Sequence, residues 1–304
     1  MTWYEKLDKV IGDYLPDLPM ERDVPMDRFT SFRIGGPARR LACPKNREQL
    51  GILMGLAREC GARPFIMGNG TNLLIPDRGL DRLVIRTAGE MSDVRLTDET
   101  VIEADAGISL SRLALFAQSQ ALTGLEFAHG IPGSLGGAVF MNAGAYGGEM
   151  KQVVQEVIVL TEDGIRHIPG AECAFGYRKS AFSDGKTVIL GAKLHLKKGD
   201  PAQIRDKMAE LMAKRKASQP LEYPSAGSTF KRPEGYYAGT LIQETGLKGL
   251  TVGGAQVSEK HAGFVINTGG ATCADVMALI AQVQDRVKQR SGVHLEPEVR
   301  IIEN

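Results

Sequence analysis

The chain has 304 residues, of which 43% are hydrophobic, and its 37 basic and 36 acidic residues leave a formal net charge of +1. This length suffices for a sizeable core and for two domains, and the balanced charge argues against a strongly basic nucleic-acid-binding protein or an acidic tail. The N-terminal stretch MTWYEKLDKVIGDYLPDL carries charges throughout and lacks the apolar region of a signal peptide, and no apolar run is long enough to span a membrane.

Cysteine and histidine usage argues against a metal site. The four cysteines are scattered with no C-x-x-C pair, and the five histidines show no metal-ligand spacing. Scattered, unpaired cysteines are typical of a reducing compartment. We therefore expect a cytoplasmic protein with no bound metal, no membrane association and no nucleic-acid partner.

Apolar periodicity in the first 200 residues predicts both helices and strands. Asn46 can cap a helix that Gly61 ends, and the apolar residues between them repeat at helical spacing. The helices are predicted within residues 1–20, stopping near Pro16, over 46–61 and over 109–122. The strands are predicted over residues 63–67, 73–76, 82–86, 100–107, 153–168 with a turn at Asp163–Gly164, and 186–200.

The composition changes near residue 200, where we place a domain boundary. The predicted elements that follow are a charged amphipathic helix beginning at Pro201, a helix within 235–250 ended by Gly246, a strand over 261–269, a helix over 272–292, and a terminal strand over 293–302. This order predicts a mixed α/β nucleotide-type domain followed by a smaller α+β domain.

Glycine is unusually frequent, with 36 residues, or roughly 12% of the chain against an average of about 7%. The first glycine cluster, FIMGNGTNLLIPD, is not a Rossmann fingerprint, because Leu73 replaces the third glycine and Pro76 follows where a helix is needed. It is not a P-loop either, because no lysine follows in register. A strand–turn–strand remains, and we expect it to form either an anion-binding nest of backbone N–H groups or an ordinary hairpin.

The second glycine cluster, GIPGSLGGAVFMNAGAYGG, places several glycines around Pro132 and Ser134. Glycine costs backbone entropy on folding, and a ligand that lies directly on the backbone usually offsets that cost. A pyrophosphate or a flat ring system is such a ligand. Two clusters separated by a strand-rich segment predict one large cofactor that contacts both.

Five motifs carry a resemblance to a known family. They are MGNGTNLLI, GIPGSLGGAVFMNAGAYG, FGYRKSAF, AGSTFKRP and EPEVR, in this order across nearly the whole chain. Together they resemble the UDP-N-acetylenolpyruvoylglucosamine reductase (MurB) family of peptidoglycan synthesis. The resemblance implies an α+β fold, with a vanillyl-alcohol-oxidase-type FAD-binding domain in two subdomains (residues 1–200, core 32–197) and a smaller α+β substrate-binding domain (201–304).

The same resemblance implies a reaction and its cofactors. FAD, bound non-covalently although His129 precedes the second glycine cluster, is reduced by NADPH and then reduces UDP-N-acetylglucosamine enolpyruvate to UDP-N-acetylmuramate. The implied catalytic residues are Arg178, Ser228 and Glu298. The implied FAD-binding residues are Gly68, Asn69, Gly70, Thr71, Asn72, Leu73, Gly130, Pro132, Gly133, Ser134, Gly136, Gly137, Asn142 and Gly144. The implied substrate-binding residues are Lys231, Arg232, Tyr236, His261 and Arg300.

The implied chemistry is a hydride transfer from flavin N5 to C3, followed by protonation at C2. Arg178 suits a substrate carboxylate whose charge grows in the transition state, and a protonated Glu298 can donate to that carboxylate. Ser228 can deliver the proton if nearby cations favour its alkoxide; Lys231 is a candidate for this role and also for the substrate diphosphate. Without the resemblance, Arg178 is equally consistent with a residue in a surface salt bridge. Glu298 is then more consistent with a residue on a solvated strand face.

Other interpretations stay open at this point. Tyr236 or Tyr237 can stack on uracil, or both can anchor a helix in the core. Arg232 replaces an asparagine that is common in the family, and the tyrosine-bearing loop that covers substrate in longer members is missing, so closure over the substrate must differ. We favour a monomer. The alternatives to the implied reaction are an FAD oxidoreductase of the same fold acting on an alcohol or hydroxy acid, and a nucleotide-sugar sensor without catalysis.

Overall fold

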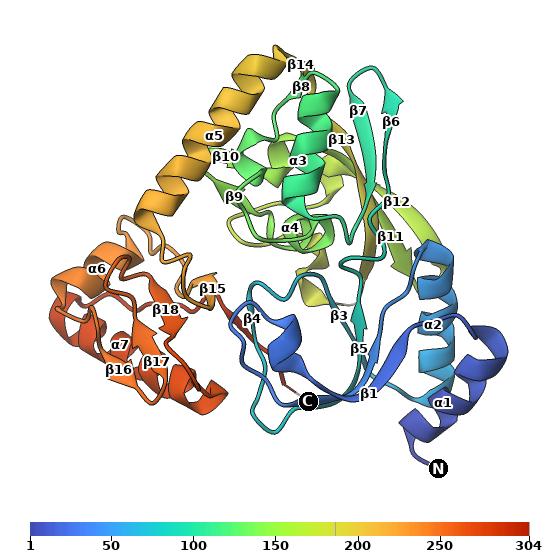
Figure 1. Ribbon diagram of the computed structural model, residues 1–304, viewed down its shortest axis with the longest axis horizontal. Coiled ribbons are helices and arrows are strands. Elements are labelled where there is room, and N and C mark those ends of the chain that lie inside the picture. The colour runs from blue at the N-terminus through green and yellow to red at the C-terminus, as the bar shows by residue number, and fades with distance from the viewer. Residues whose placement is uncertain (186, 304) are drawn as a thin grey trace. The chain divides into compact units, whose positions relative to one another are not determined.

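The computed structural model describes residues 1–185 and 187–303 and divides into two compact units. The first unit comprises residues 1–21, 40–69 and 82–214, and the second comprises residues 22–39, 70–81 and 215–304. The second unit therefore contains two N-terminal segments besides the C-terminal part of the chain. The binding roles expected for residues 1–200 and 201–304 stay predictions. Figure 1 labels most of the helices and strands that are named below.

The helices of the first unit are α1 (Trp3–Tyr14), α2 (Arg47–Cys60), α3 (Leu110–Ser119) and α4 (Leu135–Met141), and α5 (Pro201–Ser218) follows. The first three begin at residues whose side chains cap them. As predicted, α2 begins at Asn46, whose side chain accepts a hydrogen bond from Gln49 N–H, and ends at Gly61 in the left-handed conformation. The 3-10 helices of the chain are η1 (Met26–Phe29), η2 (Glu126–Ala128), η3 (Met150–Gln152), η4 (Gly170–Glu172) and η5 (Ala181–Asp184).

Two sheets form most of the remaining framework of this half of the chain. A four-stranded sheet has the order β1-β2-β5-β3, with β1 (Met20–Pro25), β2 (Pro37–Ala42), β5 (Leu80–Arg86) and β3 (Pro64–Met67). An antiparallel five-stranded sheet has the order β12-β11-β13-β7-β6, with β12 (Gly164–Pro169), β11 (Val154–Thr161), β13 (Val188–His195), β7 (Val101–Asp105) and β6 (Val94–Asp98). The predicted strand over 186–200 corresponds to β13 and the short β14 (Lys197–Lys198). Strand β14 pairs with β8 (Leu122–Thr123). Lys186 lies outside the described residues.

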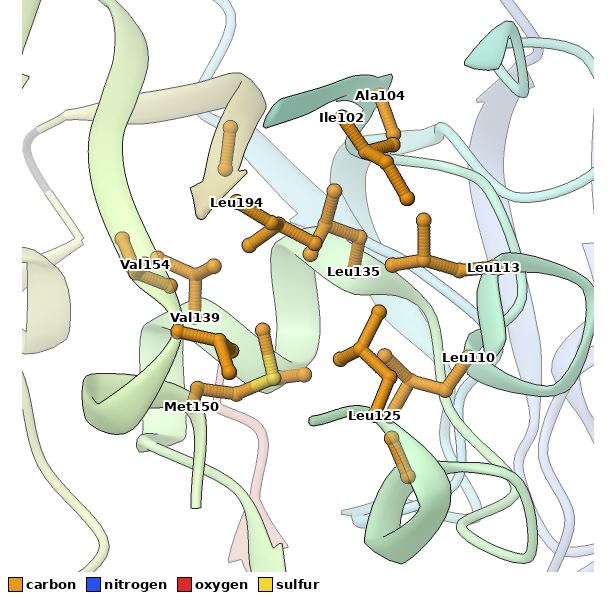
Figure 2. Close-up of a cluster of buried hydrophobic side chains, with 14 of the residues drawn as sticks. Ile102, Ala104, Leu110, Leu113, Leu125, Leu135, Val139, Met150, Val154 and Leu194 are labelled. Atoms are coloured by element: carbon orange, nitrogen blue, oxygen red, sulfur yellow. The ribbon is translucent and has the colours of Figure 1, made fainter. Parts of the chain in front are cut away.

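The five-stranded sheet has a hydrophobic core on each face. Successive residues of β11 alternate between the two cores: Val157 and Val159 belong to the cluster that includes α3 and α4, whereas Ile158 belongs to the cluster that includes α1 and α2. Figure 2 shows the first of these clusters, to which strand residues such as Leu194 contribute together with Leu113 of α3 and Leu135 of α4. Burial on both faces explains why these strands read as apolar runs.

Helix α4 lies inside the second glycine cluster, where no helix was predicted. Leu135, Ala138 and Val139 are buried at the i, i+3, i+4 spacing of a helix, a signal that the surrounding glycines obscured. A Cβ added to Gly136 would lie 2.9 Å from Ala106 Cβ, so this glycine permits close helix packing. A two-stranded hairpin of β9 (Gly144–Ala145) and β10 (Gly148–Glu149) follows.

The second unit is a small sheet packed with two helices. Its antiparallel sheet has the order β15-β18-β17-β16, with β15 (Ser225–Ser228), β18 (Phe264–Asn267), β17 (Ala255–Val257) and β16 (Thr251–Val252), and its helices are α6 (Ala238–Glu244) and α7 (Cys273–Ser291). Asp77, from an N-terminal segment, accepts hydrogen bonds from the first two N–H groups of α7, those of Cys273 at 2.7 Å and Ala274 at 3.1 Å. That contact ties residues 70–81 to the C-terminal core.

The predicted terminal strand over 293–302 is wrong for most of its length. Only β19 (Arg300–Ile301) is a strand, and it pairs in parallel with β4 (Leu73–Leu74). Pro297 has no N–H to donate to a ladder and forms a single bridge to Phe230. Glu296, Glu298 and Arg300 therefore do not share the face of a regular strand. None of the helices described is long and apolar enough to cross a membrane.

Candidate active site

Ser228 stands at a β-bulge. Strand β15 pairs with β18 through Ser225–Ile266 and Ser228–Phe264, and the register shifts between these two pairs. Gly227 lies inside the bulge with φ +77°, a left-handed conformation that favours glycine. A bulge bends its strand and redirects the side chain next to it, a device common beside active sites. The half-buried Ser228 is therefore presented by the backbone, which explains the small residues before it.

Glu298 is held beside the residue that follows Ser228. Its N–H donates to Thr229 O at 2.7 Å, and its carbonyl accepts from Asn72 Nδ2 at 3.0 Å. Arg300 N–H in turn donates to Asn72 O at 3.0 Å. One backbone network thus brings together Ser228, Glu298 and a residue of the first glycine cluster, all within the second unit.

Two of the predicted substrate-binding cations, Lys231 and Arg232, have different partners. The Lys231 ammonium forms an ion pair with the Glu296 carboxylate, and Lys231 N–H donates to Glu296 O at 2.8 Å. The Arg232 guanidinium lies 4.0 Å from the centroid of the Tyr237 ring, a cation–π contact. Tyr236 and Tyr237 are 48% and 61% exposed, so the alternative that they anchor a helix in the core is wrong.

One hydrogen bond indicates the tautomer of His261. Gly263 N–H donates to His261 Nδ1 at 3.1 Å, which places the ring proton on Nε2. Burial lowers the pKa of the imidazole, and the ring packs edge-on against Phe264 at 5.0 Å between centroids. The side chain is therefore a fixed hydrogen-bond donor close to the β18 end of the Ser228 bulge.

Arg178 occupies a strained turn in the first unit. Gly176 and Lys179 exchange backbone hydrogen bonds of 3.0 and 3.3 Å, which places Tyr177 and Arg178 at the tip. Arg178 has φ +55°, at the turn position where glycine is usual. Left-handed residues other than glycine cluster at functional sites, where the surrounding structure must hold them. Its guanidinium lies 5.1 Å from the centroid of the Tyr177 ring.

Ser134 and Gly68 fit a ligand that lies on the backbone. Ser134 is the N-cap residue of α4, yet its hydroxyl makes no capping hydrogen bond. Its Oγ is buried and has no hydrogen-bond partner among the described residues. A Cβ on Gly68 would lie 2.0 Å from this Oγ, so only glycine fits there. A buried hydroxyl that no protein group satisfies indicates an external partner, and a cofactor between the two glycine clusters supplies one.

Other predicted FAD-binding residues have structural partners. Gly136 N–H donates to Ala106 O at 2.8 Å, and a Cβ on Gly144 would lie 2.6 Å from Gly148 O. The Asn142 amide is fully hydrogen-bonded inside the protein. Close packing thus accounts for part of the second glycine cluster, and direct FAD contacts from these three residues stay predictions.

Two residues that position the site were not anticipated. Ser31 Oγ donates to Ser225 O at 2.6 Å, and Ser31 N–H donates to Gly70 O at 3.1 Å, so Ser31 joins the first glycine cluster to β15. The buried Asn267 donates from Nδ2 to Phe32 O at 3.1 Å. An asparagine inside a predicted apolar strand was a detectable signal, because asparagine is depleted in strands. Ser31 offered no such signal. Among the described residues, no cluster of ligands suits a metal ion.

Comparisons with known proteins show which family the chain is similar to. Residues 38–168 match a family model described as an FAD binding domain, and residues 219–302 match the UDP-N-acetylenolpyruvoylglucosamine reductase C-terminal domain. The chain is 50% identical to the UDP-N-acetylenolpyruvoylglucosamine reductase of Caldanaerobacter subterraneus subsp. tengcongensis over 281 residues, which cover 91% of this chain and 92% of that protein. It is 46% identical to the same-named protein of Clostridium perfringens strain SM101 over 303 residues, or 99% of each.

A solved structure shows the same fold over nearly the whole chain. The crystal structure of UDP-N-acetylenolpyruvylglucosamine reductase (MurB) from Thermus caldophilus is 37% identical and superimposes with a TM-score of 0.82. The match covers 94% of this chain and 100% of that one. The predicted fold class, an FAD-binding domain with a smaller α+β domain, is confirmed.

Proposed function

The chain belongs to the UDP-N-acetylenolpyruvoylglucosamine reductase family of FAD-dependent oxidoreductases, and we propose that it uses NADPH to reduce UDP-N-acetylglucosamine enolpyruvate to UDP-N-acetylmuramate in the cytoplasm. One observation carries the proposal: the bulge that presents Ser228 lies in the same backbone network as Glu298. Protonation of a carbon next to a carboxylate requires a positioned proton donor and a group that binds the carboxylate. The Ser228 hydroxyl and the Glu298 carboxyl are suited to these two roles.

The cofactor would be held by the backbone around Gly68 and by the buried hydroxyl of Ser134. When bound, FAD accepts a hydride from NADPH and supplies it from N5 to C3 of the enolpyruvyl group. The chain's own residues must then orient the substrate, stabilise the charge that develops at C2 and its carboxylate, and deliver one proton to C2.

Ser228 is the proposed proton donor. As the electron pair left at C2 takes the proton from Ser228 Oγ, the hydroxyl becomes an alkoxide and later regains a proton from solvent. The bulge fixes Ser228 in place, so little reorganisation is needed at the moment of transfer. Lys231, whose ammonium is paired with Glu296, supplies positive charge on the same segment for the substrate diphosphate.

Arg178 and Glu298 are the proposed partners of the substrate carboxylate. A guanidinium fork on a rigid turn offers two parallel donors to the carboxylate whose charge grows as C2 becomes a carbanion. Glu298 in its protonated form adds a further donor. His261, with its proton on Nε2, is a donor to the substrate.

The test follows the flavin spectrum through two half-reactions. The purified protein should be yellow, should bleach with NADPH, and should regain its colour anaerobically with UDP-N-acetylglucosamine enolpyruvate. Recovery only with oxygen would favour an oxidase acting on an alcohol or hydroxy acid. Protein that cannot bind FAD would favour a sugar-nucleotide sensor.

Replacement of Ser228 tests the proton donor separately. In Ser228→Ala we expect reduction by NADPH to keep its rate and reoxidation by substrate to slow by at least 10²-fold, roughly the contribution of a positioned acid. Ser225→Ala makes the same chemical change on the same strand and should leave both rates unchanged. Normal reoxidation in Ser228→Ala, measured by stopped flow, would remove Ser228 from this role.

A further inference from the structure

Asn142 ends helix α4 in a conformation that few residues adopt. Its φ is +46°, in the left-handed region that asparagine tolerates best after glycine, and its side chain is buried at 1% exposure. The side chain has three partners. Nδ2 donates to Glu149 Oε2 at 2.8 Å and to Gly176 O at 3.1 Å, and Oδ1 accepts from Lys151 N–H at 2.9 Å. Both amide hydrogens are therefore committed, which fixes the orientation of the amide.

One of these partners is the first residue of the arginine turn. Gly176 is the first residue of a four-residue turn whose third position is Arg178. The carbonyl of Gly176 accepts the hydrogen bond from Asn142 Nδ2. The far side of the turn is held as well, because the buried Ser180 donates from Oγ to Phe140 O at 2.8 Å. Two hydrogen bonds thus attach the turn to the last residues of α4, one before Arg178 and one after it.

Glu149 orients the asparagine. Its Oε2 accepts from Asn142, while its Oε1 lies 2.7 Å from the Lys151 ammonium. The backbone N–H of Lys151 donates to Asn142 Oδ1, so Lys151 contributes to both ends of this arrangement. A carboxylate that a neighbouring cation holds in place accepts a charge-assisted hydrogen bond from a defined direction, which keeps the amide turned toward Gly176.

We propose that Asn142, oriented by Glu149, is a positioning residue for Arg178. The left-handed φ of Arg178 is unfavourable and persists only if the surroundings hold it, and the bonds to α4 supply that constraint. Helix α4 carries Ser134 at its other end, so one seven-residue helix fixes the separation between the hydroxyl beside Gly68 and the arginine turn. The inference rests on the proposed role of Arg178 and adds what holds that residue in register.

The test replaces only the amide. Asn142→Gly keeps the left-handed backbone, which glycine adopts freely, and removes all three side-chain bonds. Because protein groups engage the whole Asn142 amide, we expect the FAD-loaded variant to keep its flavin content and its rate of reduction by NADPH. A loss of flavin would instead assign Asn142 to FAD binding and would overturn the inference. Reoxidation by substrate should slow on the order of 10- to 100-fold, the effect of an angstrom-scale displacement of a catalytic group. Hydrogen exchange in the peptide covering residues 174–182, measured by mass spectrometry, should become faster.

Two further variants separate positioning from general destabilisation. Asn142→Asp keeps the acceptor for Lys151 N–H but turns an acceptor toward Gly176 O, so it should fail like Asn142→Gly. Val157→Ala, which creates a cavity in the core cluster that includes α4, should lower the melting temperature without slowing reoxidation or changing exchange at 174–182.

A double-mutant cycle decides the outcome. Arg178→Ala should slow reoxidation, and adding Asn142→Gly to it should cause little further loss, because the two residues act through one guanidinium. Independent, multiplicative losses would overturn the inference. If Arg178→Ala reoxidises normally, the proposed role of Arg178 fails instead, and hydrogen exchange at 174–182 still decides whether Asn142 holds the turn.

Discussion

The His261 imidazole should show its fixed tautomer directly. Because Gly263 N–H donates to Nδ1, we expect ¹⁵N spectra at pH 7 to report a neutral ring with its proton on Nε2. Burial lowers the pKa of this ring below the value of about 6.5 that it has in an unfolded chain. A protonated ring at pH 7, or a proton on Nδ1, would contradict the hydrogen bond.

The same lowered pKa gives a pH dependence of stability with a definite sign. Between the folded pKa and about pH 6.5, the unfolded chain binds a proton that the folded chain does not, so unfolding takes up a proton. The stabilisation is complete above about pH 6.5 and is lost as the pH falls through the folded pKa. In thermal melts from pH 8 to pH 5, His261→Gln should lose less stability than the parent protein. Parallel curves would mean that His261 does not titrate in this range.

The residues proposed to carry the chemistry could be selected from the sequence, but their surroundings could not. Ser228, Arg178 and Glu298 lie within short motifs, so sequence alone singles them out. The bulge that presents Ser228 depends on its pairing with β18, and the support of Arg178 depends on Asn142, which is 36 residues away from it in the chain. Such pairings involve residues distant in sequence, and local propensity does not encode them.

Arg47 joins helix α2 to strand β7 through two carboxylates. It lies 3.1 Å from Glu103 Oε1 and 2.7 Å from Asp105 Oδ1, and both carboxylate side chains are at least 89% buried. Burial raises the pKa of Asp105 despite the arginine. At Glu103, burial also favours protonation, but hydrogen bonds from Arg95 and Arg47 outweigh it and lower the pKa.

Removal of this arginine should destabilise the first unit. Arg47→Leu leaves two buried carboxylates short of a cation, and we expect a loss of about 3 kcal/mol in the free energy of unfolding at pH 7. The deficit should shrink toward pH 4, because protonation of Glu103 and Asp105 relieves the uncompensated charge. Urea denaturation at both pH values measures this difference.

Arg95 provides the matched control for Arg47. It contacts Glu103 Oε2 at 3.1 Å, but its side chain is 71% exposed. Arg95→Leu should therefore cost less than about 1 kcal/mol, as is usual for exposed ion pairs. Equal losses for Arg47→Leu and Arg95→Leu would show that burial of the carboxylates does not determine the effect.

Most elements were predictable, and the errors have local causes. Helix α2 has an asparagine cap, an apolar stripe and a terminal glycine, so each signal agrees with the others. Helix α4 has the apolar spacing, but two glycines in its first turn suggested a loop. The last segment alternates like a strand, yet Pro297 interrupts the ladder, and only Arg300 and Ile301 form a strand.

The division of the chain into units was beyond sequence reasoning. Residues 22–39 and 70–81 group with residues 215–304 through long-range bonds, such as Asp77 with the start of α7 and Asn267 with Phe32. A change of composition marks where a segment ends, but it does not indicate which distant segment completes its core. The family resemblance nevertheless predicted the fold class, because its motifs span nearly the whole chain.

FAD should stabilise the folded protein, and it should be released chemically unchanged when the protein is denatured. A ligand that binds only the folded state adds RT ln(1 + [L]/Kd), about 2.7 kcal/mol when the free concentration is 100 times Kd. We therefore expect the melting temperature of flavin-stripped protein to rise with added FAD. Above Kd it should keep rising in proportion to the logarithm of the FAD concentration. A chain of this size should gain roughly 5 °C or more at that concentration.

Release of the flavin tests whether the attachment is non-covalent. His129 Nδ1 lies 3.4 Å from Ser111 Oγ, a contact that engages the histidine inside the protein. Acid precipitation should therefore leave a colourless pellet and a yellow supernatant, and His129→Ala should bind FAD with the same stoichiometry after reconstitution. A yellow pellet from the parent protein that turns colourless in His129→Ala would instead establish a covalent bond at this ring. Ser134→Ala should weaken FAD binding without changing the pellet, because it removes a buried donor and no covalent link.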